Sequence, residues 1–322
     1  MHARRSADLL QAGLTRKVLR GPRAERRSHG LYRPAGVVLE AQLERLDDAL
    51  GVMVPGTVLG GWASLLLQGN DWFDGWAPDG RRRALVHCPR GTQLRRRDVV
   101  EPLRADLRPD ERTEVGDGPG VAVSTMARAA FDEARLAVDL RSAVVALDMA
   151  ASSVHGRPHT SLAEIRRIEG ALRKVRGIVQ VRRALLWASE RSASPPETRT
   201  RLCATLDAGL SDLLVNAAVF ADTGELLGVA DLIDPTCGLV IETDGAGHRE
   251  EPRHTLDNRR EEAFEHAGCV VVRATPLDHR DLGGLAARIR RGHQTARRSS
   301  RRQWTVEAPA WWESWPGASP WL

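Results

Sequence analysis

Two short apolar segments near the C-terminal end of the chain each lead into a carboxylate. Asp231 interrupts the segment GVADLI, and Glu242 ends the segment GLVIE eleven residues later, after a turn at residues 235–238. If the two segments pair as a β-hairpin, both carboxylates emerge at the same end of the sheet. Neighbouring carboxylates repel each other unless a cation lies between them, and their oxygens suit Mg²⁺. The spacing therefore predicts a metal site at Asp231 and Glu242.

Three more polar residues extend this candidate site. Glu197 stands in the first turn of a helix expected after SASPPE, while Asp244 and His248 follow Glu242 in the stretch ETDGAGH. The glycines there let the chain turn sharply beside a ligand, and a histidine can transfer a proton at neutral pH. Each residue alone is explained as an exposed or structural polar group, but the set favours catalysis. The predicted catalytic residues are Asp231, Glu242, Asp244, His248 and Glu197, with Asp231 and Glu242 as metal ligands.

Two arginines near these carboxylates are candidate phosphate-binding residues. Asp257 and Arg260 lie three residues apart at the start of a predicted helix, so they share one face. Arg260 either contacts a phosphate or pairs with Asp257. Arg273 interrupts the apolar stretch CVVVRAT, where an unpaired charge is costly, and we therefore expect its guanidinium to meet an anion.

The elements expected around these residues form one compact unit over residues 194–298. Ser194 is expected to cap a helix that opens at Pro195 and Pro196, followed by a hairpin turned at residues 222–224 and a third strand that ends in ETDG. A helix stopped by Gly268, the strand CVVVRAT and a last helix complete the order α-β-β-β-α-β-α. The predicted fold class is therefore α/β (α+β).

Three further regions make up the rest of the chain. Residues 1–36 have the order helix, turn, helix and basic hairpin of a small winged helix, with Ser6 and Thr15 as caps and Tyr32 as an anchor; an irregular basic arm fits equally well. Residues 37–193 form a mixed helical and strand domain without a catalytic set, including a buried helix expected over TVLGGWASLLLQG. Residues 299–322 form an Arg- and Trp-rich tail that docks either on the chain itself or on a partner.

Composition limits the class of protein. The chain has 322 residues, 42% of them hydrophobic, and a net charge of +5, which permits a polyanionic partner without requiring one. Basic clusters stand at residues 81–83, 95–97 and 288–302. The four cysteines show no C-x-x-C spacing, which argues against a zinc ribbon and a disulfide framework. Without a signal sequence or a long apolar run, we expect a soluble, cytoplasmic protein with no membrane contact and no small-molecule cofactor.

The motifs of the last region together resemble a known family. The stretches SPPETRTRL, GVADLID, GLVIETDGAGH and DNRREEAFEHAGCVVVRAT are similar to the C-terminal nuclease-like domain of a large bacterial family related to very-short-patch-repair endonucleases, of the PD-(D/E)xK superfamily. The resemblance covers residues 194–290. More weakly, residues 6–36 and the segments TVLGGWASLLLQG and VSTMARAAFDEA resemble the winged-helix arrangement of AbiEi-type antitoxins of type IV toxin–antitoxin systems.

This resemblance implies a restriction-endonuclease-like α-β-β-β-α-β core with roles assigned by position. Asp231 and Glu242 match the acidic metal ligands of the superfamily, and Glu197 matches the acidic residue of its first helix. His248 matches the histidine of the repair-like branch. The D-x-x-R helix and the basic strand residue of that branch are matched by Asp257, Arg260 and Arg273.

The chain departs from the superfamily at three positions. Asp244 stands where lysine is usual, although aspartate is common in the repair-like branch. Ala230 stands where proline is common, and Gly228 where relatives often have a basic residue. Without the lysine, any activity must rest on the metal, His248 and arginine.

The sequence leaves three functions open. The leading expectation is a Mg²⁺-dependent DNA endonuclease, with DNA and a repair protein or cognate toxin as partners. The alternative is a DNA-binding regulator of antitoxin type that retains an inert nuclease fold, because the arginine clusters suit phosphates. A third is a protein-interaction module that uses the tryptophans of the tail.

Overall fold

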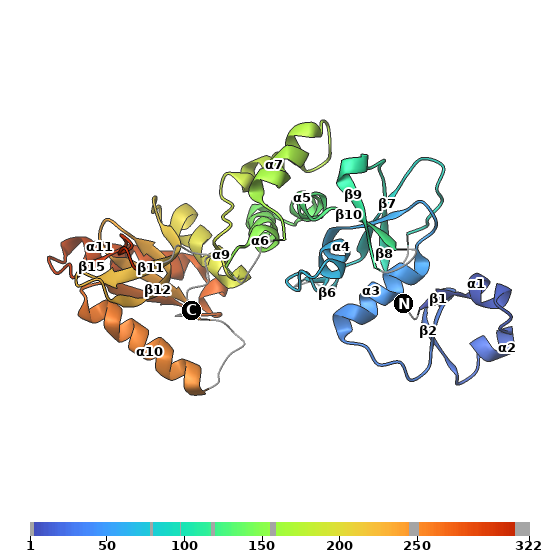
Figure 1. The fold of residues 1–322 in the computed structure, drawn as a ribbon, viewed down its shortest axis with the longest axis horizontal. Coiled ribbons are helices and arrows are strands. Elements are labelled where there is room, and N and C mark those ends of the chain that lie inside the picture. Colours follow the sequence, from blue (N-terminus) through green and yellow to red (C-terminus); the bar gives the residue numbers. More distant parts are fainter. Residues whose placement is uncertain are drawn as a thin grey trace. The chain divides into compact units, whose positions relative to one another are not determined.

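The computed structural model describes residues 3–77, 80–96, 98–116, 120–154, 159–244 and 251–312, with only the backbone of residues 77 and 251–258. The chain is of mixed α/β class, as the sequence predicts. It divides into two compact units, Met1–Leu136 with Ala163–Val181, and Ala137–Leu162 with Arg182–Leu322 (Figure 1). Each unit is described by itself below.

The first unit begins with a small three-stranded sheet in the order β1-β3-β2. Its elements are β1 (Arg4–Arg5), α1 (Ser6–Gln11), α2 (Arg16–Leu19), β2 (Ala24–Ser28) and β3 (Leu31–Pro34). Thr15 caps α2 by accepting a hydrogen bond from Val18 N–H, as predicted. The predicted cap at Ser6 is wrong, because α1 begins at Ser6 itself and the cap position falls on Arg5. Helix α3 (Ala41–Val52) follows, and its Asp47 accepts a 2.8 Å hydrogen bond from the backbone of Ala3.

A five-stranded sheet in the order β8-β7-β4-β10-β9 forms the rest of this unit. The predicted helix over TVLGGWASLLLQG is partly wrong: its first residues form a central strand of this sheet, and the helix begins only at Gly61. Pairing with β7 and β10 on either side buries this strand completely, a tertiary effect that local pattern does not report. The elements are β4 (Val58–Gly60), α4 (Gly61–Leu67), β5 (Trp76–Ala77), β6 (Gly80–Arg81), β7 (Ala84–Cys88), β8 (Val100–Arg104), β9 (Arg112–Val115), β10 (Val121–Ser124), α5 (Met126–Leu136) and α7 (Leu162–Ala171).

Helix α8 (Ile178–Leu185) spans the point at which the chain passes from one unit to the other. The second unit contains a five-stranded sheet in the order β14-β13-β12-β11-β15. Its elements are α6 (Leu140–Ala151), α9 (Pro195–Leu202), β11 (Leu214–Ala221), β12 (Leu226–Asp234), β13 (Leu239–Thr243), α10 (Glu251–His266), β14 (Val270–Ala274), α11 (Leu282–Arg298) and β15 (Trp304–Thr305). From α9 to α11 the element order is the predicted α-β-β-β-α-β-α.

Two helices cover opposite faces of this sheet (Figure 1). Helix α11 packs through Leu285 and Ile289 on the face that carries Leu232 and Ile241. Helix α10 packs through Phe264 on the other face. Because neighbouring residues of a strand point to opposite faces, β12 and β13 can present one set of polar groups to each helix.

The first part of the tail belongs to this sheet. Trp304 lies in β15, which pairs with β11, and its side chain is buried in the core under α10. Trp311 and Trp312 make edge-to-face contacts with Phe220. These three tryptophans therefore dock on the chain itself, and the remaining two of the tail lie outside the described residues.

Two general features complete the fold. All four cysteines are free thiols. Throughout the described ranges, no helix combines the length and the apolar character that crossing a membrane requires.

Candidate active site

Asp231 and Glu242 lie side by side where β12 and β13 part. The backbone pairing of the hairpin reaches Leu232 opposite Ile241 and stops there. Beyond that point, backbone N–H groups donate to side-chain carboxylates instead of to backbone carbonyls. Thr243 N–H donates to Asp231 Oδ2 at 2.7 Å, and Asp231 N–H donates to Glu242 Oε1 at 3.3 Å. The structure thus brings the two predicted metal ligands together at the end of the sheet.

These two carboxyl groups are held at high electrostatic cost. Glu242 has a side chain only 7% exposed, and Asp231 is partly buried. Burial, and then the charges of Glu242 and Glu197, raise the pKa of Asp231 well above its usual range. Burial also raises the pKa of Glu242, although Arg260 opposes this. The site therefore concentrates negative charge in a partly desolvated place.

Glu197 is close enough for its charge to act on Asp231, but its oxygens have a local role as well. Ser194 Oγ donates to Glu197 Oε1 at 2.8 Å, and Ala193 N–H donates to Oε2 at 2.9 Å. Ser194 also accepts from Glu197 N–H, as predicted for the cap of α9. Asn216 Nδ2 donates to Oε2 at 2.8 Å. Glu197 is therefore fixed by the start of its own helix and by β11.

Arg260 of α10 is the cation that meets Glu242. Its Nη2 donates to Glu242 Oε2 at 2.5 Å. Gly228 of β12 makes this approach possible, because a Cβ at that position would lie 2.7 Å from Arg260 Cγ. The sequence predicted either a phosphate or Asp257 as the partner of Arg260. The side chain of Asp257 lies outside the described part of the chain. A larger residue at position 228, such as the basic residue that is frequent in the resembling proteins, would collide with the Arg260 side chain.

Arg273 meets anions that belong to the protein. Its Nη2 lies 2.6 Å from Glu261 Oε2, and its Nη1 lies 3.6 Å from Asp244 Oδ1. Asp244 N–H also donates to the carbonyl oxygen of Ala274, so this residue continues the β13–β14 pairing. His248 lies outside the described residues, and its predicted role stays a prediction.

The sequence missed Asn216, which helps to hold Glu197. Asn216 has a φ of +46°, in the left-handed region that asparagine tolerates better than most residues. Arg191 donates to its carbonyl oxygen at 2.7 Å, and Asn216 Nδ2 donates back to Arg191 O at 2.7 Å. The sequence did contain a signal for this role, because an asparagine stands inside the otherwise apolar stretch LVNAAVF.

A second group that the sequence missed contains the side chains of Asp234, Cys237 and His293. Within the described part of the chain, these are the only three His, Cys, Asp or Glu residues whose ligand atoms all lie within 4.8 Å of one another. Glu197, Asp231 and Glu242 do not form such a group. A thiol and an imidazole do not suit Mg²⁺, which prefers oxygen ligands.

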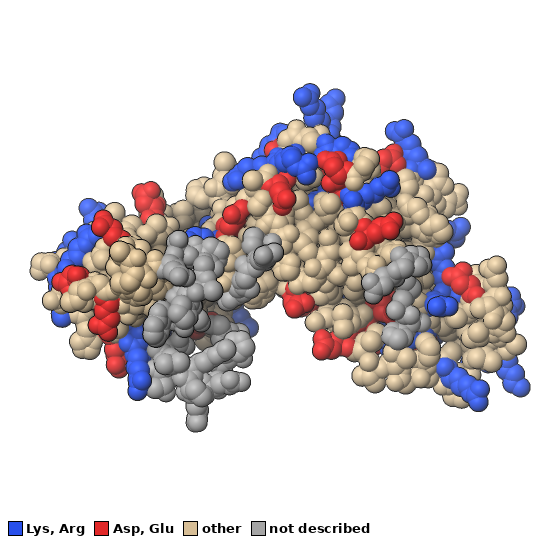
Figure 2. Space-filling view, viewed as in Figure 1, with Lys and Arg blue, Asp and Glu red and all other residues tan. Residues whose placement is uncertain are grey.

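The predicted arginine clusters are partly paired with acidic residues. Arg82 binds Glu133, and Arg96 Nε lies 2.7 Å from Glu101 Oε2. A different basic surface lies on α2 and on the β2–β3 hairpin that follows it in the sequence. Its exposed residues are Arg16, Lys17, Arg20, Arg23 and Arg26. Figure 2 shows Lys and Arg side chains projecting from this N-terminal part at the lower right of the view.

Comparisons with known proteins add no family to this description. No protein-family model matches the chain, and no curated protein matches it either. The resemblance to very-short-patch-repair endonucleases and to AbiEi-type antitoxins therefore rests on the motifs in the sequence.

Proposed function

We propose that residues 194–298 form a metal-dependent DNA endonuclease whose active site contains Asp231 and Glu242. The observation that supports this proposal is the adjacency of these two carboxyl groups at the open end of a hairpin. Arg260 offsets one negative charge, while Glu197 adds another. A divalent cation would relieve the remaining repulsion, and such charge clusters are typical of functional sites.

The chemistry of the donors fits Mg²⁺. Mg²⁺ is commonly bound by one or two carboxylates together with water and substrate phosphates, which is what Asp231 and Glu242 offer. A cation bound here supplies Lewis-acid activation of the scissile phosphate and lowers the pKa of an attacking water.

The residues around the carboxylates have positioning roles in this proposal. Thr243 N–H fixes one oxygen of Asp231 and leaves the other for a ligand. Arg260 keeps a guanidinium beside Glu242 and can stabilise charge that develops on a phosphate. Arg273 holds Asp244 at the rim of the site. His248 remains the proposed proton donor.

A nicking assay tests this function. Purified protein with Mg²⁺ should convert supercoiled plasmid to the open circular form, and Asp231→Asn and Glu242→Gln should abolish the conversion. Asp222→Asn is the matched control, because Asp222 is an exposed aspartate in a turn of the same sheet. Chelation should stop the wild-type reaction. If the wild type leaves supercoiled, linear and single-stranded DNA intact with Mg²⁺ and Mn²⁺, the enzyme proposal is wrong.

A DNA-binding regulator is the second candidate, favoured by the exposed basic residues on α2 and its hairpin. Neutralising Arg16, Lys17 and Arg20 together should weaken DNA binding and reduce its dependence on salt concentration, because fewer counterions would be released. Replacing Arg166, Arg173 and Lys174, which are exposed on and after α7, is the matched control. A gel-shift titration over a salt series measures both effects.

The same binding measurement separates the two candidates. Specific binding to the promoter of the protein's own gene that survives Asp231→Asn, without nicking by the wild type, favours the regulator. Binding that is equal for all DNA sequences and accompanied by nicking favours the nuclease. No binding at all excludes the regulator.

A further inference from the structure

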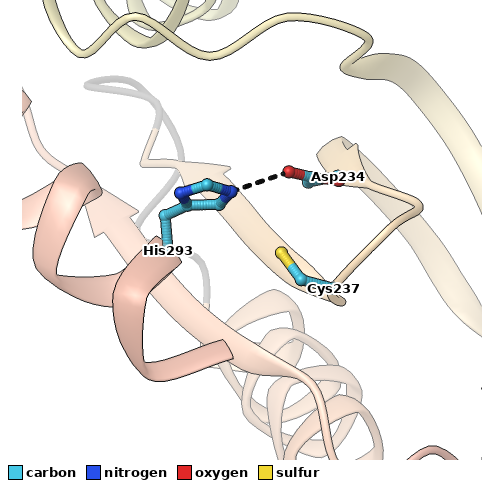
Figure 3. Close-up of side chains that lie close together, drawn as sticks. All are labelled: Asp234, Cys237 and His293. Carbon is cyan, nitrogen blue, oxygen red and sulfur yellow. Dashed lines mark ion pairs between the residues drawn. The ribbon is translucent and has the colours of Figure 1, made fainter. Parts of the chain in front are cut away.

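Asp234, Cys237 and His293 converge where the end of β12 and the turn after it meet helix α11 (Figure 3). Asp234 ends β12 and meets helix α11 through His293, with 3.1 Å between His293 Nε2 and Asp234 Oδ2. Glu242, in contrast, meets helix α10 through Arg260. The two polar groups are therefore separated by the sheet, and the proposal below does not depend on the proposed nuclease.

The turn between β12 and β13 positions two of the three side chains. Asp234 Oδ1 accepts hydrogen bonds from Thr236 N–H at 2.8 Å and from Thr236 Oγ1 at 2.6 Å. This leaves Asp234 Oδ2 directed at His293. Gly238 closes the turn with a φ of +76°, and its lack of a side chain lets the ring of Trp304 pack against it. Cys237 is thus held beside Asp234 by a fixed backbone.

His293 is positioned by the helix rather than by the turn. It lies on α11, whose apolar residues Leu285 and Ile289 anchor the helix to the core. Residues 289 and 293 are four apart and therefore share one face of the helix. The imidazole therefore lies over the end of β12, with Nε2 3.1 Å from Asp234 Oδ2, and its side chain is 27% exposed.

We infer that Asp234, Cys237 and His293 bind a transition-metal ion of the Zn²⁺ class. Carboxylate, thiolate and imidazole are the three ligand types that Zn²⁺ uses in proteins, whereas Mg²⁺ avoids sulfur and nitrogen. Their ligand atoms lie within 4.8 Å of one another, so small side-chain movements bring them to three corners of a tetrahedron around one ion. With three protein ligands, the fourth position falls to water or another small ligand.

The surroundings of the three residues suit such an ion in charge and in access. A carboxylate and a thiolate together balance the two positive charges of Zn²⁺, so the loaded site is neutral. This matters because Cys237 also lines a cavity of about 390 Å³ whose other residues include Arg297, Arg301 and Arg302. The cavity gives the ion a path from solvent to the sulfur, while a neutral site does not repel the arginines.

Metal titration of the full chain tests the inference. Metal-free wild-type protein should bind one equivalent of Zn²⁺ by elemental analysis, and Co²⁺ in its place should give the near-ultraviolet absorption of a thiolate–Co²⁺ bond. Cys237→Ser and His293→Gln should each weaken Zn²⁺ binding by at least ~100-fold, because losing even the partner of a ligand costs 10–100-fold. Mg²⁺ should not displace Co²⁺.

Two matched variants serve as controls. Cys88→Ser removes a buried thiol of the first unit, and His266→Gln removes an exposed histidine of α10; both should bind Zn²⁺ as the wild type does. Wild-type protein without an equivalent of Zn²⁺, or a Cys237→Ser variant that binds it as tightly, would overturn the inference. Loss of Zn²⁺ in Asp231→Asn but not in Cys237→Ser would overturn it too, because the ion would then lie at the other site.

A measurement on the unaltered chain covers the case in which a variant fails to fold. Alkylation of the wild type, read by mass spectrometry, should modify Cys237 in metal-free protein and lose this modification when Zn²⁺ is added. Labelling of Cys237 that Zn²⁺ leaves unchanged contradicts a bond between the metal and this sulfur.

Discussion

Asp231 donates a hydrogen bond from its backbone N–H to the side chain of Glu242 at the point where β12 and β13 separate. The carboxylate of Asp231 accepts from Thr243 N–H, and the backbone N–H of Asp231 donates to the carboxylate of Glu242. The two side chains thus replace backbone partners that the strands no longer provide. This arrangement fixes two acidic groups next to each other, and the protein bears the resulting repulsion as a loss of stability.

Asp231→Asn should therefore stabilise the protein. The variant keeps the size of the side chain and removes the charge, so we expect the free energy of unfolding to rise by about 1 kcal/mol near neutral pH. Burial first, and then Glu242 and Glu197, raise the pKa of Asp231. A carboxyl with a pKa raised by folding contributes fully to stability below its unfolded pKa and loses that contribution as the pH rises through its folded pKa.

The advantage of Asp231→Asn should accordingly vanish below about pH 3.5 and grow as the pH rises. Urea unfolding over a pH series measures this difference. Asp222→Asn, in an exposed turn, should follow the wild type throughout. A variant less stable than the wild type near neutral pH would show that Asp231 is a stabilising residue, contrary to this account.

Arg260→Ala should leave Glu242 buried without its cation. We expect a loss of about 1–2 kcal/mol in the free energy of unfolding, a value near the lower end for charged hydrogen bonds because Arg260 is 35% exposed. If Mg²⁺ binds at this site, it should restore more stability to Arg260→Ala than to the wild type. Thermal unfolding with and without Mg²⁺ measures both effects, and Arg259→Ala, at an exposed neighbouring position, is the control. Equal responses of Arg260→Ala and the wild type to Mg²⁺ would contradict binding there.

Arg201→Ala should strongly destabilise the second unit. Arg201 Nη2 donates to the fully buried Asp148 at 2.5 Å, and this bond ties α9 to α6. The Nη1 atom of Arg201 donates to Trp187 O at 2.6 Å. Removing the guanidinium leaves a buried carboxylate without its charge partner, at a cost of about 3 kcal/mol. Chemical denaturation followed by circular dichroism measures this cost. Arg199→Ala, two residues away on α9 and exposed, should cost far less, and comparable losses in the two variants would refute the argument.

Asp132→Asn should make the first unit less stable near neutral pH. Burial favours the neutral form of Asp132, but the hydrogen bond and charge of His87, with Arg128 and Arg135, outweigh it and hold the pKa of this carboxyl below its usual range. Such a group stabilises the native state above its unfolded pKa and loses this contribution as the pH falls toward its folded pKa. We expect a loss of about 3 kcal/mol that shrinks below about pH 3. Denaturation over a pH series, with the exposed Asp71→Asn as control, checks the sign; a loss that grows in acid would contradict it.

The sequence alone determined the order of elements in the second unit and the hairpin that carries Asp231 and Glu242. These features depend on local signals: Ser194 before two prolines, the turn residues at 222–224 and 235–238, and apolar runs of strand length. Such signals act between neighbours in the chain, so they are legible without the fold. They also placed the two carboxylates at one end of one sheet, since a hairpin of known turn has a fixed register.

The tertiary structure decided which groups meet across the sheet. Arg260 faces Glu242, His293 faces Asp234, and Trp304 of the tail becomes a strand residue, each through contacts between distant parts of the chain. The same holds for β4, which has a helical pattern but is paired on both sides. Helix docking and the pairing of strands that are distant in the chain depend on the packing of the whole core, which overrides local preference, so no spacing within the sequence could report them.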